Sequence, residues 1–323
     1  MHYFLGVDSG GTKADFLLSD ETRELARVRT GTIKRMKASE NVAESNLQMA
    51  LSQLTAISGV SMQSVTRCCI GTAGETVPLV VDWLRDAFGR YVGGELILIG
   101  DVEIALDSAF HGQRGVVVLA GTGSNVAGRA ATGQIVTAGG WGPALADQGS
   151  GHFLGLESLR RGFLAIDRQQ PSLILDAART YWNLSSVGAL IEFANANPPP
   201  EFSRLVPSVV SCAKQGDPVA LEVLEQGGTD LANLVSLVIE RIRKLETEST
   251  AAFKVPAVAV AGSILEHLDA VRKALESALR KQYPDIAVLE LPADPPAGAL
   301  WNARHRSIST DRSAELTVQS FCS

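Results

Sequence analysis

A short glycine-rich segment near the start of the chain carries the residue types that bind phosphate. Asp8 is followed at close spacing by Gly10, Gly11, Thr12 and Lys13. The two glycines let backbone amides approach an anion, and the hydroxyl and ammonium groups add donors. The carboxylate of Asp8 has the chemistry to hold a hydrated Mg²⁺. The same pattern is also typical of an ordinary glycine hairpin, and it matches neither a Walker A loop nor a G-x-G-x-x-G fingerprint.

A second segment of the same character follows a fully apolar run. Its residues are Gly121, Thr122, Gly123, Ser124 and Asn125. The segment is again flanked by strand-like residues on both sides. Two such turns on two repeated sheets are able to face each other and hold the phosphates of one nucleotide between them. The sequence therefore favours a phosphate site over a simple hairpin.

The elements that must position these turns alternate between strand and helix patterns. In the first third of the chain, short apolar runs predict strands and near-helical spacing of apolar residues predicts helices. The strands are expected at residues 3–7, 14–18, 25–29, 65–70 and 96–99, and the helices at 41–57, 76–88 and 104–109. Three strands followed by helix-crossover strands indicate a mixed α/β sheet.

A second unit opens in the same way near Gly115. Strands are expected at 116–119, 126–129 and 135–138, so the strand–turn–strand opening occurs twice. Residues 150–245 are predicted to be mainly helical, with breaks at 197–200 and at Gly227-Gly228. The last predicted elements are a strand at 255–260, a helix at 262–282, a strand at 286–291 and a helix at 296–304. The polar stretch 307–323 has no clear pattern.

The composition excludes several classes of protein. The 323 residues are 46% hydrophobic and 20% charged, which excludes wholesale disorder, and the length predicts two domains. With Lys+Arg 29 against Asp+Glu 35 the net charge is −6, which argues against nucleic acid as a partner. The first strand has no basic leader before it, and no apolar run approaches the ~18–20 residues of a membrane span. We therefore expect a cytoplasmic protein without a membrane partner.

Taken together, these motifs make the chain similar to the N-acetylglucosamine kinase and BadF-type ATPase family of the actin/hexokinase/heat-shock ATPase superfamily. The resemblance covers nearly the full length. It is carried by the segments Gly6-Val7-Asp8-Ser9-Gly10-Gly11-Thr12-Lys13, Gly100-Asp101, Leu119-Ala120-Gly121-Thr122-Gly123-Ser124-Asn125, Gly139-Gly140-Trp141-Gly142-Pro143, Asp147-Gln148-Gly149-Ser150-Gly151 and Pro296-Ala297-Gly298-Ala299-Leu300. It implies an α/β fold of two actin-like (ribonuclease H-like) domains with mixed five-stranded sheets and an interdomain cleft. The domains would be 1–112 plus 294–323, and 113–293 with a helical insertion.

The resemblance implies ATP and Mg²⁺ as cofactors. Asp8 would organise Mg²⁺ through water, and the turn that follows it would grip the outer phosphates. The second turn would cradle phosphate, and a third glycine turn after the strand at 255–260 would pack on adenosine. The nucleotide-binding residues implied are Asp8, Gly10, Gly11, Thr12, Lys13, Gly121, Thr122, Gly123, Ser124, Gly262 and Ser263.

The resemblance also implies a sugar site. Phosphorylating a hydroxyl needs a carboxylate to accept the proton, and Asp101 matches that position. The other implied sugar-binding residues are Thr122, Gly140, Trp141, Gly142, Asp147 and Gln148. Trp141 offers an apolar face for a pyranose ring, and Asp147 accepts hydrogen bonds from its hydroxyls. Structural alternatives are a helix cap for Asp101, a core position for Trp141, and a cap of the helix near Ser150 for Asp147.

Two departures from the family pattern leave the sugar open. Gln148 stands where the family usually has Glu, and no Asn after the third strand aligns with the one that family members often place there to contact the sugar. That position holds a loop with Lys34, Arg35 and Lys37, which is either solvated or faces a negatively charged substituent such as the lactyl carboxylate of a muramic sugar. We therefore expect a homodimeric kinase of N-acetylglucosamine or glucosamine, acting at the 6-hydroxyl. N-acetylmuramic acid is the alternative substrate.

Two other classes of function are disfavoured. The family contains ATPases that activate 2-hydroxyacyl-CoA dehydratases through an iron–sulfur cluster bridging a dimer. The four cysteines do not fit such a cluster, because Cys68 and Cys69 lie in a predicted strand, Cys212 in a predicted helix and Cys322 in the tail. We expect them to be free thiols, most of them buried. A sugar-sensing repressor is disfavoured because neither a helix-turn-helix segment nor a cysteine-rich zinc motif is present.

Overall fold

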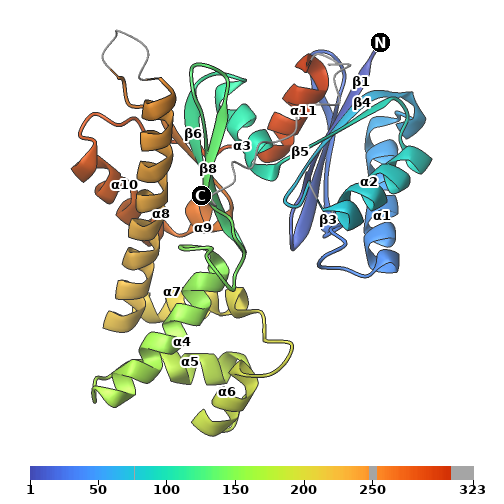
Figure 1. Cartoon of the computed structure of the whole chain (residues 1–323). Coiled ribbons are helices and arrows are strands. Elements are labelled where there is room, and N and C mark those ends of the chain that lie inside the picture. Colours follow the sequence, from blue (N-terminus) through green and yellow to red (C-terminus); the bar gives the residue numbers. More distant parts are fainter. Residues whose placement is uncertain (76, 247–252, 307–323) are drawn as a thin grey trace.

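The computed structural model describes residues 1–75, 77–246 and 253–306, and its sheets lie in two lobes (Figure 1). The N-terminal lobe holds a five-stranded sheet in the order β3-β2-β1-β4-β5. Its strands are β1 (Tyr3–Ser9), β2 (Lys13–Ser19), β3 (Glu24–Gly31), β4 (Val65–Thr72) and β5 (Glu95–Ile99). The helices of this lobe are α1 (Glu40–Ser58), the single turn η1 (Met62–Ser64) and α2 (Pro78–Tyr91).

Helix α1 begins and ends at residues that suit those positions. The Ser39 hydroxyl accepts a hydrogen bond from the Val42 amide at 3.4 Å, and Gly59 ends the helix with φ of 73°. Leu47 and Leu54 are fully buried in the apolar cluster beneath the sheet. The helix therefore covers one face of the sheet with the stripe that its periodicity predicts.

The strand order brings two carboxylates to one edge of this sheet. Strands β1, β4 and β5 are parallel, so their C-terminal ends meet at the same edge. Asp8 of β1 pairs with Gly71 of β4, which in turn pairs with Ile99 of β5. Asp101 follows β5 by two residues. The register explains why residues 93 positions apart approach each other.

The C-terminal lobe repeats this arrangement in a sheet whose described strands have the order β8-β7-β6-β9. The strands are β6 (Gly115–Ala120), β7 (Ser124–Arg129), β8 (Ile135–Gly139) and β9 (Val258–Ala261). In both sheets an antiparallel meander of three strands is followed by a parallel neighbour of the first strand. The predicted two-domain α/β fold and the repeated opening are confirmed, but the second sheet has four described strands where the prediction was five.

Helices fill the rest of this lobe, and the lower layer in Figure 1 is the helical insertion. They are α4 (Gly151–Asp167), α5 (Ile174–Tyr181), α6 (Val187–Ala194), η2 (Phe202–Leu205), α7 (Val206–Lys214), α8 (Pro218–Leu245), α9 (Ser263–His267) and α10 (Asp269–Gln282). The predicted break at 197–200 is confirmed, but the break at Gly227-Gly228 is wrong. Helix α8 continues through both glycines. A Cβ on Gly227 would lie 2.7 Å from Leu154 Cδ2, and a Cβ on Gly228 would lie 2.3 Å from the Val271 carbonyl oxygen. The glycines allow close helix packing rather than a turn.

Several predicted boundaries differ from the structure. The strand expected at 255–260 begins only at Val258, because Pro256 has no amide to donate. The strand expected at 286–291 forms a single parallel bridge, Val288 to Val258, between two prolines. The helix expected at 262–282 is divided at Leu268, and α2 begins at Pro78, whereas its predicted start at 76 lies outside the described residues. None of the described helices has the length and apolar character to cross a membrane.

Two helices lie between the lobes in Figure 1, α3 (Asp101–Phe110) and α11 (Pro295–His305). Helix α3 starts at Asp101, three residues before its predicted start at Ile104. A Cβ on Gly298 of α11 would lie 1.8 Å from the Ile104 carbonyl, so this glycine lets the two helices touch. The division into residues 1–112 plus 294–323 and residues 113–293 stays a prediction, and residues 307–323, with Cys322, lie outside the described residues.

Candidate active site

The two glycine turns predicted to hold phosphate meet at the junction of the lobes. The hydroxyls of Thr12, in the β1–β2 turn, and Thr122, in the β6–β7 turn, are 3.0 Å apart. Both threonines are exposed. A Cβ on Gly11 or Gly121 would meet nothing within 4 Å, so open space lies above both turns. The structure thus brings together two donor-rich turns that are about 110 residues apart in the chain.

Asp8 lies beside these turns in a crowded electrostatic setting. Its cross-strand partner is Asp15, a second carboxylate. Burial, first, and then the charges of Asp101 and Asp15 raise the pKa of Asp8 to about 7. Lys13 acts in the opposite direction, but its Nζ lies 3.7 Å from Asp15 Oδ2, and Arg29 Nε lies 2.6 Å from Asp15 Oδ1. Asp15 is therefore neutralised by two cations, whereas Asp8 is left with excess negative charge around it.

Asp101 occupies the first position of α3 rather than its cap, which is Gly100. The carboxylate Oδ1 accepts a hydrogen bond from the Val102 amide at 2.9 Å. Burial raises the pKa of Asp101, Glu75 raises it further, and the ammonium group of Lys34 lowers it. A raised pKa is what a carboxylate needs in order to take a proton near neutral pH. Asp101 is therefore not the N-cap residue of α3, although its side chain accepts a hydrogen bond from one amide of the first turn.

The segment from Gly139 to Ser150 forms a tight loop beside the second turn. Its residues with left-handed φ are Gly139, Gly140, Gly142, Asp147 and Gly149. The Asp147 carboxylate packs on Gly123, where a Cβ would lie 2.9 Å from Oδ2. Burial raises the pKa of Asp147, and the amides of Gly142 and Ser124 lower it. Ser150, not Asp147, caps α4 by accepting a hydrogen bond from the Phe153 amide at 3.1 Å, so the capping alternative for Asp147 is wrong.

Trp141 projects from this loop with 73% of its surface exposed, so its interpretation as a core residue is wrong. Behind the loop, Asn125 Oδ1 and Gln148 Oε1 are buried and have no hydrogen-bond partner among the described residues. Gly140 lies against Asn125, since a Cβ there would be 2.6 Å from Nδ2. Asn125 therefore lies directly beneath the loop that carries the exposed Trp141, and both buried acceptors have hydrogen-bonding capacity that the described residues do not use.

The third glycine turn lies next to the second. Ala261 of β9 pairs with Leu119 of β6, so the turns that follow these strands share one edge. Gly262 has φ of 91° and packs against the Ala120 carbonyl, where a Cβ would be 2.4 Å from the oxygen, so only glycine fits. The hydroxyl of Ser124, predicted to bind nucleotide, instead donates to the Gln148 carbonyl at 2.8 Å. Ser124 therefore connects the loop from Gly139 to Ser150 with the β6–β7 turn.

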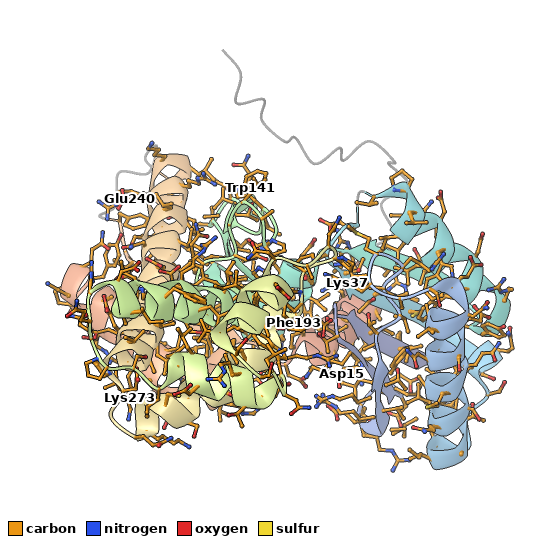
Figure 2. The ribbon with its side chains drawn as sticks, turned by 90° about the horizontal axis from the view of Figure 1, so that it is seen from below. Asp15, Lys37, Trp141, Phe193, Glu240 and Lys273 are labelled. Atoms are coloured by element: carbon orange, nitrogen blue, oxygen red, sulfur yellow. The ribbon has the colours of Figure 1, made fainter. Side chains whose placement is uncertain are left out.

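The basic loop after β3 contributes charges that sequence reasoning did not place. Lys34 is partly buried, and burial lowers its pKa, whereas the nearby carboxylates of Asp101 and Glu75 partly oppose that effect. Lys37 is exposed and belongs to the N-terminal lobe, yet it lowers the pKa of Asp147 in the C-terminal lobe. In Figure 2, Lys37 lies on the side of its lobe that is turned toward the other lobe. The Arg35 guanidinium donates hydrogen bonds to the Ala38 carbonyl at 2.9 Å and to the Glu40 carboxylate at 3.3 Å, so both contacts are to the loop itself or the start of α1.

Glu75 and His152 are further members of the site that the sequence analysis missed. Glu75 follows β4, whose C-terminal end lies at the same edge as Asp8, so its place after a predicted strand was the available signal. The backbone amide of His152 donates a hydrogen bond to the Thr122 carbonyl at 3.1 Å. Burial lowers the pKa of the His152 imidazole. Its position in the first turn of a helix gives no comparable signal in the sequence.

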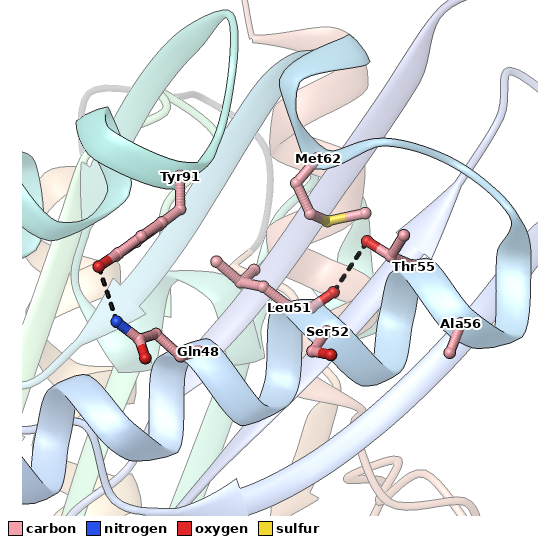
Figure 3. A pocket seen from close by; sticks show the side chains of 7 residues that line it. All are labelled: Gln48, Leu51, Ser52, Thr55, Ala56, Met62 and Tyr91. Atoms are coloured by element: carbon pink, nitrogen blue, oxygen red, sulfur yellow. Dashed lines mark hydrogen bonds between the residues drawn. The ribbon is translucent and has the colours of Figure 1, made fainter.

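Two surface hollows lie elsewhere. One of about 500 Å³ lies between α1, η1 and the end of α2 and is lined by Gln48, Leu51, Ser52, Thr55, Ala56, Met62 and Tyr91 (Figure 3). The other, of about 440 Å³, lies between α5 and α7. Neither contains a residue of the predicted site.

Comparison with known proteins shows which family this arrangement belongs to. The model of the BadF/BadG/BcrA/BcrD ATPase family matches residues 5–300. The chain belongs to this family. An N-acetylmuramic acid/N-acetylglucosamine kinase of Clostridium acetobutylicum is 26% identical over 312 residues, covering 94% of this chain and 99% of its own. An N-acetyl-D-glucosamine kinase of Dictyostelium discoideum is 27% identical, covering 92% and 96%.

A solved structure of a proposed N-acetylglucosamine kinase from Chromobacterium violaceum superimposes with a TM-score of 0.70 at 25% identity, covering 93% of this chain and 98% of that one. In this chain, Cys68 and Cys69 are buried in β4 and Cys212 is buried in α7. Burial raises the pKa of Cys68 and Cys69, which keeps both as neutral thiols.

Proposed function

We propose that the protein transfers the γ-phosphoryl group of ATP to the 6-hydroxyl of N-acetylglucosamine or glucosamine, with Asp101 as the general base. One observation carries the proposal. A carboxylate of raised pKa begins α3 at the junction where the phosphate turns of Thr12 and Thr122 touch. Phosphoryl transfer depends on positioning, charge neutralisation and a base for the acceptor hydroxyl, and this junction supplies a residue for each.

The chain is an ATP-dependent sugar kinase by its family and by relatives that match almost all of its length. An amino sugar is the acceptor class that both curated relatives name. On the sugar side, we assign ring stacking to the exposed Trp141 and hydroxyl recognition to Asp147. Asn125 and Gln148 add acceptors that have no hydrogen-bond partner in the part of the chain that the structure describes.

The donor set at Asp8 fits a magnesium ion. Burial, and then the charges of Asp101 and Asp15, raise the pKa of Asp8 to about 7, and a dication would relieve the repulsion between these carboxylates. Among the described residues no group of three His, Cys, Asp or Glu side chains is arranged to hold a metal. Mg²⁺ typically binds through one or two carboxylates, waters and the phosphates of its nucleotide. Bound there, the ion neutralises the charge that develops on the transferred group.

The direct test is ADP release measured with ATP and Mg²⁺ and a panel of acceptors. The panel holds N-acetylglucosamine, glucosamine, N-acetylmuramic acid, glucose and a blank. We expect turnover that depends on an amino sugar, and we expect phosphorus–proton NMR correlation to place the phosphate on carbon 6. ATP hydrolysis of equal rate in the blank would contradict the proposal. A cytoplasmic homodimer without nucleic-acid or membrane partners remains our prediction from the sequence, and light scattering tests the dimer.

N-acetylmuramic acid is the second candidate, and Lys37 is the observation that favours it. Its ammonium group acts across the lobes on Asp147, on the sugar side of the junction. A carboxylate on the sugar would pair with it, whereas N-acetylglucosamine carries no such group. The Clostridium relative is named for both sugars.

Substitution of Lys37 separates the two sugars. Lys37→Ala should lower kcat/KM for N-acetylmuramic acid by about 10-fold, the loss expected for one charge-assisted contact, and leave N-acetylglucosamine within about 2-fold. Lys273→Ala is the matched control, because Lys273 is an exposed lysine of α10 on the far side of the C-terminal lobe (Figure 2). An equal loss for both sugars would remove Lys37 from substrate selection.

A further inference from the structure

A buried polar cluster lies at the end of α3 that is opposite to Asp101. The Asp107 carboxylate accepts hydrogen bonds from three separate parts of the chain. The donors are the guanidinium of Arg129 at the end of β7, Asn302 Nδ2 of α11 at 2.9 Å and the Gly112 amide at 3.2 Å. Asp107, Arg129 and Asn302 are only 1%, 7% and 3% exposed. None of the three belongs to the site described above.

The cost of this cluster indicates that it does more than fill space. A buried ion pair gives up the hydration of both charges, and an apolar pair of similar volume is often no less stable. Here the two charges come from different lobes, because β7 belongs to the sheet of the C-terminal lobe and α3 continues directly from β5 of the N-terminal lobe. The pair therefore bridges the two lobes, which would move relative to each other if the predicted interdomain cleft closes around its ligands.

Helix α3 is held by both lobes along its length. On one side, Ile104 packs against Gly71 of β4 and Gly298 of α11, where added Cβ atoms would lie 2.1 Å and 1.8 Å from it. On the other side, Ala105 and Leu106 share an apolar cluster with the C-terminal sheet. Asp101 and Asp107 are six residues apart on this one helix, about 9 Å at 1.5 Å per residue. A displacement of one end is thus transmitted to the other.

We propose that the Asp107–Arg129 ion pair, braced by Asn302, couples movement of the C-terminal lobe to the position of Asp101. When β7 moves, Arg129 moves with it. Because Arg129 is paired with Asp107, the C-terminal turn of α3 follows, and Asp101 at the other end of the same helix is displaced as well. The two residues are positioning residues, since neither touches the substrate. The inference rests on the proposed role of Asp101 and adds a structural link between closure and chemistry.

The test uses the full chain with Asp107→Asn and Arg129→Met combined. Removing both charges leaves no unpaired charge in the interior, which limits the loss of stability. Three quantities are measured: the Kd of a non-hydrolysable ATP analogue with and without N-acetylglucosamine, kcat, and the melting temperature. In the parent we expect the sugar to tighten analogue binding by about 5- to 150-fold, the usual range of site–site coupling. In the double variant that ratio should fall to about 1, kcat should fall about 10-fold or more, and the Kd of the analogue alone should stay within about 2-fold.

A matched control uses an ion pair that lies within one lobe. Arg114 Nε and Glu246 Oε1 are 2.8 Å apart, and this partly buried pair joins the start of β6 to the end of α8. Arg114→Met with Glu246→Gln should leave the coupling ratio and kcat unchanged, whatever it does to the melting temperature. An equal loss of coupling in both double variants would show a general effect of lost stability and overturn the proposal.

Arg129→Lys gives an independent readout, because it keeps the charge but loses the planar guanidinium geometry. A reduced coupling ratio at the parental melting temperature supports the proposal, and a parental ratio overturns it, whether or not the double variant folds. A parent without any coupling also overturns it. A parent that couples the two ligands but releases no ADP with any sugar contradicts the proposed function instead, so the two failures are distinguishable.

Discussion

Replacing Asp8 by Asn should change how stability depends on pH. The pKa of Asp8 is raised from 3.8 to about 7 in the folded protein, first by burial and then by Asp101 and Asp15. Between these two values the folded protein binds a proton more tightly than the unfolded chain does. The free energy of unfolding therefore falls as pH rises through this window. A shift of about three units at 1.36 kcal/mol per unit sets an upper limit of about 4 kcal/mol for the stability lost above pH 7.

The Asp8→Asn protein should not lose this stability as pH rises, because Asn does not titrate. Urea unfolding measured every half unit from pH 4.5 to 8.5 should give curves that start close together and diverge, with the variant more stable by up to about 4 kcal/mol above pH 7. Mg²⁺ with ADP should narrow the difference by stabilising only the wild-type protein. Parallel curves over the whole range would refute the electrostatic account of Asp8.

Asp20→Asn is the matched control with the opposite sign. The amides of Arg23 and Thr22 lower the pKa of Asp20 to about 2, so its stabilising effect is present above pH 3.8 and is lost only as pH falls toward 2. This variant should be less stable than the wild-type protein by an amount that does not change between pH 5 and 8.5.

Two further predictions concern packing and the nucleotide turns. Gly298→Ala should lower the melting temperature by about 3–10 °C, because the new methyl group would lie 1.8 Å from the Ile104 carbonyl and 2.7 Å from the Ser108 amide, and differential scanning calorimetry measures this. An unchanged melting temperature would mean that α11 and α3 separate without cost. Thr122→Val should raise the KM for ATP by about 10-fold through the loss of a hydroxyl donor to phosphate, whereas Thr122→Ser should not, and equal KM values would remove the hydroxyl from nucleotide binding.

Local patterns were sufficient to predict the phosphate turns and the repeated sheets. The glycine turn after Asp8 and the turn at Thr122 are each defined by a few adjacent residues between apolar strands. The repeated topology indicated that the two turns are able to face each other, but their meeting at 3.0 Å depends on how the lobes sit relative to each other. The early start of α3 was missed because Asp101-Val102-Glu103 carries little apolar periodicity, although Asp and Glu suit a first turn.

Features that depend on long-range packing were not predictable. Gly227-Gly228 was interpreted as a break because glycine disfavours helices, and only the close contact of α8 with α4 and α10 explains why the helix continues. The action of Lys37 on Asp147 depends on how the lobes sit relative to each other, which no local pattern encodes. The same holds for Asp107, Arg129 and Asn302, which are ordinary residues in sequence and one buried cluster in the fold.

The most direct test of the central claim is turnover by Asp101→Asn. The substitution keeps the size of the side chain and its bond to the Val102 amide, so the melting temperature should not fall and the Kd for ATP should not change. If Asp101 accepts the proton of the sugar hydroxyl, sugar-dependent ADP release should fall by about 10²–10⁴-fold in kcat. Normal turnover by a variant with the parental melting temperature would show that another group is the base, and Asp147 would be the next carboxylate to replace.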